Sequence, residues 1–131
     1  MSQLYIIPKD FGKLQSGEEL DENAFLAYDT HGVLNEDKNN CVLWVTCYTQ
    51  RSTDMVDPFI GEGKRFDPEN GLFIITVNMP GNGLSFSPTS AGIKWPTCGL
   101  TYNDNAKIVR TLILLHIHIS ILSSSCIIVH L

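Results

Sequence analysis

The sequence predicts an α/β fold built on a mostly parallel sheet, and three observations support this prediction. Residues 41–48 and 72–77 are nearly unbroken apolar runs, rich in β-branched and aromatic residues, as is typical of strands buried on both faces. About 20 residues separate the two runs, enough for a crossover between parallel neighbours. The second run leads into residues 78–83, a turn rich in glycine and asparagine, and open α/β sheets bind ligands at such strand ends. We therefore expect residues 72–77 at the centre of the sheet, beside residues 41–48.

Three segments precede the first buried run. Residues 10–22 are mainly polar and indicate a short edge strand followed by a turn at Ser16 and Gly17. Residues 23–30 contain consecutive apolar side chains and predict a second strand. Residues 35–40 are acidic and amide-rich, so we expect a turn with no core residue.

The segments after the buried runs are less regular. Residues 50–70 carry charged side chains around prolines and glycines, which predicts a solvated loop with at most one helical turn. Residues 102–110 predict a helix that Asn103 or Asp104 caps. Its apolar positions are Ile108, Val109 and Leu112.

The end of the chain has a different character, because residues 111–131 contain no formally charged side chain. Three interpretations are open for this segment: a membrane helix, a buried helix followed by a strand, or a tail foreign to the preceding domain. Its length suits a membrane span, but its three histidines and four serines disfavour insertion. We therefore expect residues 1–110 to form one partial domain and residues 111–131 to be an apolar, low-complexity tail of unassigned structure.

Composition excludes several classes of function. The net charge of −5 and the pI near 5.2 provide no basic footprint for nucleic acid. The four cysteines have no CxxC spacing, and two of them stand in apolar runs, which favours reduced thiols and a cytoplasmic location. The first residues lack the basic lead and the cleavage site of a secretory signal.

Short motifs assign no catalytic, cofactor-binding or metal-binding residue. Residues 83–87 resemble a G-x-S-x-G nucleophile elbow without its last glycine, but Pro88 follows instead of a helix, so Ser85 is expected to be an ordinary loop serine. His116 and His118 lack the further ligands that zinc needs. Residues 61–64 lack the spacing of a phosphate-binding loop. We expect no cofactor.

The order and spacing of five stretches carry a resemblance. They are LQSGEEL (14–20), AFLAYDTHGVLN (24–35), NNCVLWVTCYT (39–49), IGEGKRFDPENGLFIITVNMPGNGLSFSPTS (60–90) and YNDN (102–105). Together they resemble the N-terminal portion of the homoserine O-acetyltransferase-like family. This resemblance implies a truncated α/β-hydrolase fold and acyl transfer from acyl-CoA to a hydroxyl through a Ser, Asp and His triad. It also implies that the backbone at Tyr48 supplies one oxyanion-hole donor, although Gln50 stands where the family usually has glycine.

The resemblance also implies what this sequence lacks. In the family, a strand and a G-x-S-x-G elbow follow the helix that begins near YNDN, whereas residues 111–131 contain no glycine. We therefore expect a fragment of an acyltransferase that does not turn over acyl-CoA and a hydroxyl acceptor by itself. The alternatives are a non-catalytic interaction module, which would self-associate through exposed sheet edges, and a tail-anchored membrane protein.

Overall fold

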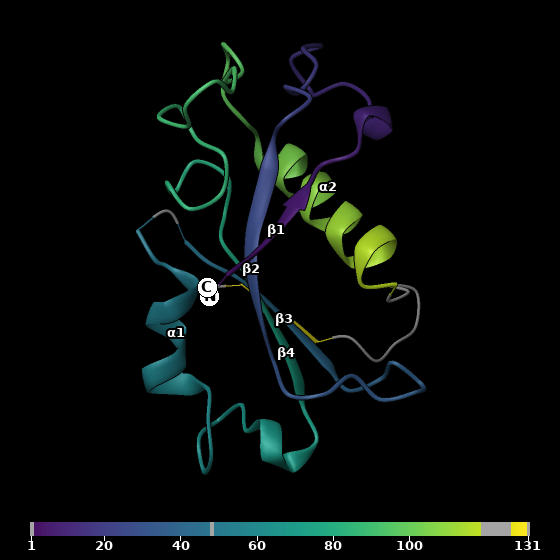
Figure 1. The fold of residues 1–131 in the computed structure, drawn as a ribbon, viewed down its shortest axis with the longest axis vertical. Helices are drawn as coiled ribbons and strands as arrows, with labels where there is room; N and C mark the ends of the chain where they lie inside the picture. The colour runs from purple at the N-terminus through teal and green to yellow at the C-terminus, as the bar shows by residue number, and fades with distance from the viewer. Residues whose placement is uncertain (1, 48, 119–126, 131) are drawn as a thin grey trace.

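The computed structural model describes residues 2–47, 49–118 and 127–130, and within them the chain forms a mixed sheet between helices (Figure 1). The strand order is β1-β2-β4-β3-β5. The strands are β1 (Gln3–Ile6), β2 (Phe25–His31), β3 (Cys41–Val45), β4 (Phe73–Val77) and β5 (Ile127–His130).

Strand β4 lies at the centre of the sheet. It pairs in parallel with β3, with Val45 opposite Val77, and antiparallel with β2, with Tyr28 opposite Val77. Strand β3 also pairs in parallel with β5, and β1 pairs antiparallel with β2. Among the described strands, only β2 therefore runs against the others. The predicted α/β class, the mostly parallel sheet and the adjacency of the two buried strands are confirmed.

Helices cover both faces of the sheet (Figure 1). Helix α1 spans Ser52–Phe59 and helix α2 spans Tyr102–Thr111. A π-helical turn, η3 (Leu112–His116), continues α2. Two 3-10 turns, η1 (Lys9–Phe11) and η2 (Pro68–Asn70), lie in the connections.

The alternation of side chains along β3 divides the core between these faces. Leu43 faces α2, in the larger cluster with Ile108. Val42 and Trp44 face α1, in the smaller cluster, where the Trp44 ring centroid lies 5.1 Å from that of Phe59. Both clusters are needed because strands at the centre of a parallel sheet have no solvent-facing side.

The prediction of an edge strand in residues 10–22 is wrong. This segment contains η1 and a turn, joined by one isolated bridge between Lys13 and Glu19, and the edge strand is β1 at Gln3–Ile6. Only Tyr5 in β1 is buried, so the short apolar patch at the N-terminus gave too little alternation to predict a strand.

Helix α1 is longer than the single turn predicted for residues 50–70. It includes Pro58 near its end, yet Phe59 packs against Trp44 and the first residue, Ser52, is fixed by the end of β4. Tertiary contacts thus override a poor local propensity. The exposed side chains of Asp54 and Asp57 lie on its surface.

Helix α2 begins as predicted, but its cap is different. The N-cap residue is Thr101, whose hydroxyl accepts from the Asp104 backbone N–H, and Asp104 occupies the third helical position. The Asp104 carboxylate accepts from the Thr101 backbone and also from the Gln15 backbone N–H at 2.9 Å. The predicted apolar positions Ile108, Val109 and Leu112 are buried.

Within the described residues, the uncharged segment 111–131 forms the end of a helix and one strand. Leu112 and Ile113 join the core, and β5 pairs with β3. His116 ends η3, and His118 follows it at an exposed position. No helix within the described ranges has the length and apolarity to cross a membrane. The boundary placed at residue 110 stays a prediction.

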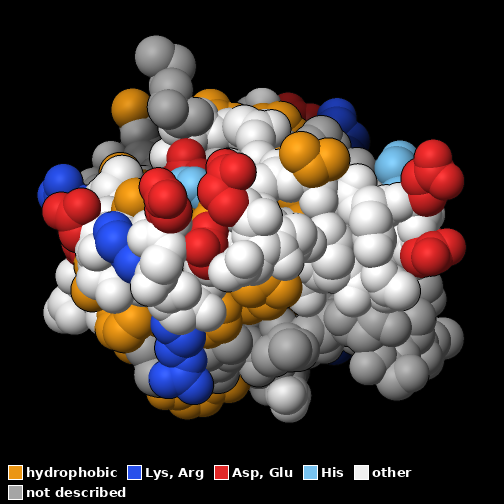
Figure 2. Space-filling model, turned by 90° about the horizontal axis from the view of Figure 1, so that it is seen from below, with side chains coloured by type: hydrophobic (Ala, Val, Ile, Leu, Met, Phe, Trp, Pro, Cys, Tyr) orange, Lys and Arg blue, Asp and Glu red, His pale blue; other side chains and the backbone are white. Residues whose placement is uncertain are grey.

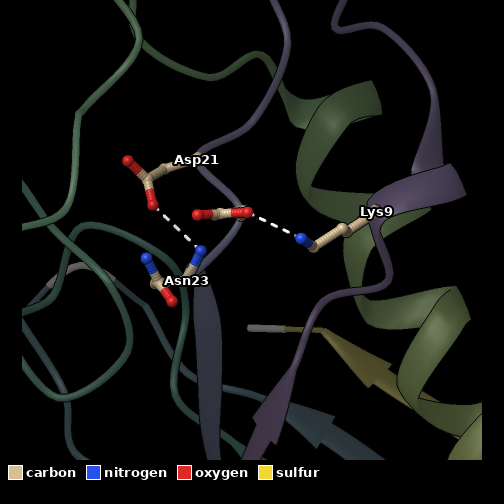
Figure 3. Close-up of polar contacts among 4 residues, drawn as sticks. Lys9, Asp21 and Asn23 are labelled. Carbon is tan, nitrogen blue, oxygen red and sulfur yellow. Dashed lines mark hydrogen bonds and ion pairs between the residues drawn. The ribbon is translucent and has the colours of Figure 1, made fainter.

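The surface mixes charges of both signs. Figure 2 shows acidic and basic side chains interspersed on one face, with apolar side chains between them. One ion pair is present among the described residues. It joins the exposed Lys9 Nζ to Glu22 at 2.6 Å (Figure 3).

The Asp104 carboxylate makes stability depend on pH. Burial by itself would raise its pKa, but hydrogen bonds from Thr101 and Gln15 outweigh burial, and the pKa lies below its usual value. Its contribution is complete above the unfolded-state pKa of about 3.9 and is lost as the pH falls through the folded-state pKa. We expect Asp104→Asn to lower the unfolding free energy by about 1–2 kcal/mol at pH 7, in urea denaturation.

The same comparison at low pH provides the control. The difference between wild type and Asp104→Asn should shrink below pH 4. Asp37→Asn changes an exposed turn carboxylate in the same way and should have little effect at either pH. A difference that stays constant down to pH 2 would contradict this role for the ionised carboxylate.

Candidate functional site

The carboxyl ends of the parallel strands β3 and β4 form the candidate site. The strands end side by side, and the loop after β3 begins at Thr46, whose N–H donates to Val77 O at 2.9 Å. The Thr46 hydroxyl accepts from the N–H of Met79, the second residue of the loop after β4. The two loops are thus tied together at the point where this class of sheet binds ligands.

The side chain of Asn78 connects this edge to two other elements. It is fully buried, and its side-chain oxygen accepts from the Ser52 N–H at 2.9 Å. Its side-chain nitrogen donates to Ser52 Oγ at 2.9 Å and to Ala27 O at 3.2 Å. One amide therefore joins the end of β4 to the first residue of α1 and to β2.

Ser52 extends this network across the sheet. Its hydroxyl donates to Asp29 Oδ2 at 2.5 Å, and Asp29 also accepts from Ser2 Oγ at 3.0 Å. Because Ser52 is only 1% exposed, its bonds to Asn78 are shielded from water and hold the start of α1 in one place. Sequence analysis placed Ser52 in a solvated loop and missed this role.

Asn82 shapes the glycine-rich turn after β4. Its side-chain oxygen accepts from the Leu84 N–H at 2.9 Å, and its nitrogen donates to Gln50 O at 3.3 Å in the loop after β3. Gly81 and Gly83 both have a φ of +91°, a conformation that other residues rarely adopt. The turn predicted at residues 78–83 is confirmed, and its asparagine side chains bridge the two loops.

Ser85 is held inside this turn. It is fully buried, its hydroxyl donates to Asn78 O at 2.5 Å, and it accepts from the Ala27 N–H at 2.9 Å. Within the described residues, the partners of this hydroxyl are backbone groups and not a base. Ser85 is buried and not in an open polar loop as expected, and its lack of a catalytic role stays a prediction.

Polar contacts also join the loops around this edge. Asp21 accepts from the backbone N–H of Asn23 at 2.9 Å (Figure 3) and from that of Lys94 at 2.9 Å, and these bonds lower its pKa. Glu18 accepts from the Thr97 N–H at 3.0 Å, which lowers its pKa in the same way. The long segment between β4 and α2 is therefore anchored to the segment before β2.

The predicted oxyanion donor, Tyr48, lies outside the described residues. On either side of it, the Gln50 N–H donates to Cys47 O at 3.2 Å. Within the described ranges, no group of three His, Cys, Asp or Glu side chains is placed to hold a metal ion. The polar residues that directly follow the buried strands, Thr46 and Asn78, were the sequence signal for the network.

The Asn78 network makes a testable contribution to stability. Asn78→Ala leaves the Ser52 N–H and the Ala27 carbonyl without this partner, and we expect it to lower the unfolding free energy by about 2–4 kcal/mol. Tryptophan fluorescence during urea denaturation would measure this loss. Asn103→Ala, at an exposed asparagine of α2, is the matched control.

A double-mutant cycle that combines Asn78→Ala with Ser52→Ala tests whether the two residues act as one network or as two independent sites. The two substitutions should be non-additive by about 0.5–3 kcal/mol, because both remove the hydrogen bond from Asn78 Nδ2 to Ser52 Oγ. Additive losses would show that Asn78 and Ser52 do not act as one unit.

Comparisons with known proteins point to esterases. No protein-family model matches the chain. It is 44% identical over 69 residues to a probable esterase of Corynebacterium glutamicum, covering 53% of this chain and 20% of that protein. It is 43% identical over 79 residues to the ethyl acetate hydrolase of Pseudomonas veronii, covering 60% and 22%. A homoserine O-succinyltransferase of Leptothrix cholodnii is 33% identical over 110 residues, covering 73% and 28%.

Solved structures give the same result for the fold. The acetyl esterase MekB superposes with a TM-score of 0.74 at 30% identity, covering 89% of this chain and 34% of that one. An acetylester hydrolase from Corynebacterium glutamicum superposes with a TM-score of 0.75 at 28% identity, covering 91% and 34%. The chain thus spans about a third of the length of these structures and a quarter of that of the curated relatives. Over that length it has the α/β-hydrolase fold of the esterases.

Proposed function

We propose that this chain is the portion of an α/β-hydrolase-fold esterase that builds the loops around the reacting ester, without the nucleophile. The observation that carries the proposal is the buried network of Thr46, Ser52 and Asn78, which fixes both loops at the carboxyl edge of β3 and β4. Support for the reaction class comes from the likeness to an acetyl esterase over 89% of the chain.

The chemistry of such a site needs rigid loops. Ester cleavage passes through a tetrahedral intermediate, and backbone N–H groups stabilise its oxyanion when they are already in position. In the proposal, the N–H of Tyr48 is one of these donors. The network suits this role because it fixes Thr46 before Tyr48 and Ser52 after it.

The acyl acceptor distinguishes two versions of this function. An esterase passes the acyl group to water, whereas a homoserine acyltransferase passes it to a hydroxyl, and both use the same oxyanion stabilisation. The higher identities to the esterases favour water, and the weaker likeness to a homoserine O-succinyltransferase supports transfer to a hydroxyl as the second candidate.

The chain alone is proposed to be inactive. The only serine in an elbow-like motif, Ser85, is buried and bonded to Asn78 O and the Ala27 N–H. We expect the purified chain to hydrolyse 4-nitrophenyl acetate no faster than Ser85→Ala does, because the loss of a nucleophile costs several orders of magnitude in rate. Turnover that depends on Ser85 would contradict this.

A chimera tests the proposed function directly. Residues 1–110 would replace the matching stretch of the Pseudomonas veronii ethyl acetate hydrolase, and we expect the chimera to hydrolyse ethyl acetate. Tyr48→Pro, which removes the N–H, should lower kcat by about 100- to 1,000-fold. Tyr48→Phe keeps the N–H and should retain activity.

Two outcomes would change the assignment. Equal activity of Tyr48→Pro and Tyr48→Phe would exclude the Tyr48 N–H as a donor. A folded chimera that acylates homoserine but does not release acid from ethyl acetate would favour the acyltransferase version.

A further inference from the structure

A groove runs along the second half of helix α2, next to the 3-10 turn η1, which lies beside α2 in Figure 1. Its volume is about 450 Å³, in the range of sites that hold one small organic molecule. Phe11 of η1 and Lys13 form one wall, and residues of α2 and η3 form the other. None of the described residues that line it belongs to the network at the carboxyl edge of β3 and β4.

The charge of this groove is opposite to that of the chain as a whole. The chain has 14 acidic and nine basic residues, yet three of the basic residues line the groove and none of the described acidic residues does. The three are Lys13, Lys107 and Arg110. All are exposed, and none forms an ion pair with a carboxylate in the described part of the chain. The groove is therefore a local region of positive potential, which attracts anions.

Two acidic residues lie close to these cations without forming an ion pair with them. The Asp104 carboxylate accepts hydrogen bonds from the backbone N–H groups of Thr101 and Gln15. Glu19 stands opposite Lys13 across an isolated bridge, but it lines two neighbouring grooves and not this one. The three cations therefore keep their charge available for a bound anion.

The groove continues from the cations into an apolar part. Lys107, Arg110 and Leu114 follow one another at spacings of three and four residues, which places them along one side of the helix. Leu114 and Leu115 line the end of this side, and Leu115 is 57% exposed. At a helical rise of about 1.5 Å per residue, about 12 Å separates Lys107 from Leu115. The groove thus offers positive charge first and apolar surface beyond it.

We propose that this groove binds an anionic amphiphile with one alkyl chain, namely an alkanoate of medium length. The Arg110 guanidinium binds the carboxylate, because its parallel N–H groups match the two carboxylate oxygens, and Lys13 and Lys107 add positive charge. The alkyl chain lies against Leu114 and Leu115 and is removed from water there. An anionic bilayer is the competing partner, but the cations and leucines line a recess of small-molecule size. The proposal goes beyond the proposed function, because it requires no ester cleavage.

Isothermal titration calorimetry of the full 131-residue chain with sodium octanoate tests the site. We expect octanoate to bind, and octanol, which has the same chain length without the charge, to bind at least about tenfold more weakly. Inorganic phosphate, an anion without an alkyl chain, should also bind at least about tenfold more weakly. Added salt should weaken octanoate binding, because salt screens exposed cations.

Variants test the two parts of the groove separately. Arg110→Glu reverses one charge and should weaken octanoate binding at least about tenfold. Arg65→Glu is the matched control, since it makes the same change at an exposed arginine outside the groove and should leave binding unchanged. Leu115→Ser should weaken binding about fivefold through lost apolar contact. Circular dichroism would check folding, and an Arg110→Glu chain that fails to fold would be replaced by Lys107→Glu, at another exposed position.

Four results would overturn the proposal. They are equal affinities for octanoate and octanol, equal affinities of Arg110→Glu and Arg65→Glu for octanoate, phosphate binding as tight as octanoate binding, and no octanoate binding by the wild-type chain. The last result, together with co-sedimentation on phosphatidylglycerol vesicles that Arg110→Glu abolishes, would assign the groove to an anionic membrane surface instead. Octanoate binding that Arg110→Glu weakens would support the groove even if the chimera cleaves no ester, which would contradict only the proposed function.

Discussion

The side-chain amide of Asn78 connects three segments that are far apart in the sequence. It donates to Ala27 O in β2 and to Ser52 Oγ, and it accepts from the Ser52 N–H at the start of α1. An amide buried without partners would cost several kcal/mol, on the order of 2–7 by transfer measurements, whereas a satisfied one fixes the groups around it. The positions of β2, β4 and α1 therefore depend on one another at this point.

This constraint explains the rigidity of the carboxyl edge. Thr46 and Asn82 tie the loop after β3 to the turn after β4, and Ser85 closes that turn onto β2. The Thr46 and Ser85 hydroxyls, which accept from the Met79 and Ala27 N–H groups, are both buried, so the turn after β4 cannot move without breaking shielded hydrogen bonds. An edge built in this way can hold backbone N–H groups in position before a substrate arrives, which is the requirement of acyl-transfer catalysis.

The two faces of the sheet are held in different ways. On one face, Trp44 packs against Phe59 and Phe66, with ring centroids at 5.1 and 5.4 Å, and α1 lies over the strands. On the other face, α2 packs against β3 through Ile108 and Leu43, and Asp104 anchors it to the Gln15 backbone. Stacked aromatic rings therefore fix one helix, and an aliphatic core together with a buried carboxylate fixes the other.

The sequence by itself determined the buried strands and their relation. Residues 41–48 and 72–77 predicted adjacent parallel strands, confirmed as β3 and β4, because consecutive apolar residues leave no side for solvent. Tertiary structure decided the rest. Helix α1 forms in spite of Pro58 because Ser52 is fixed by Asn78 and Phe59 by Trp44, and Thr101 takes the cap because Asp104 also reaches Gln15. These outcomes depend on partners between 15 and 89 residues away, and local propensity contains no information about such contacts.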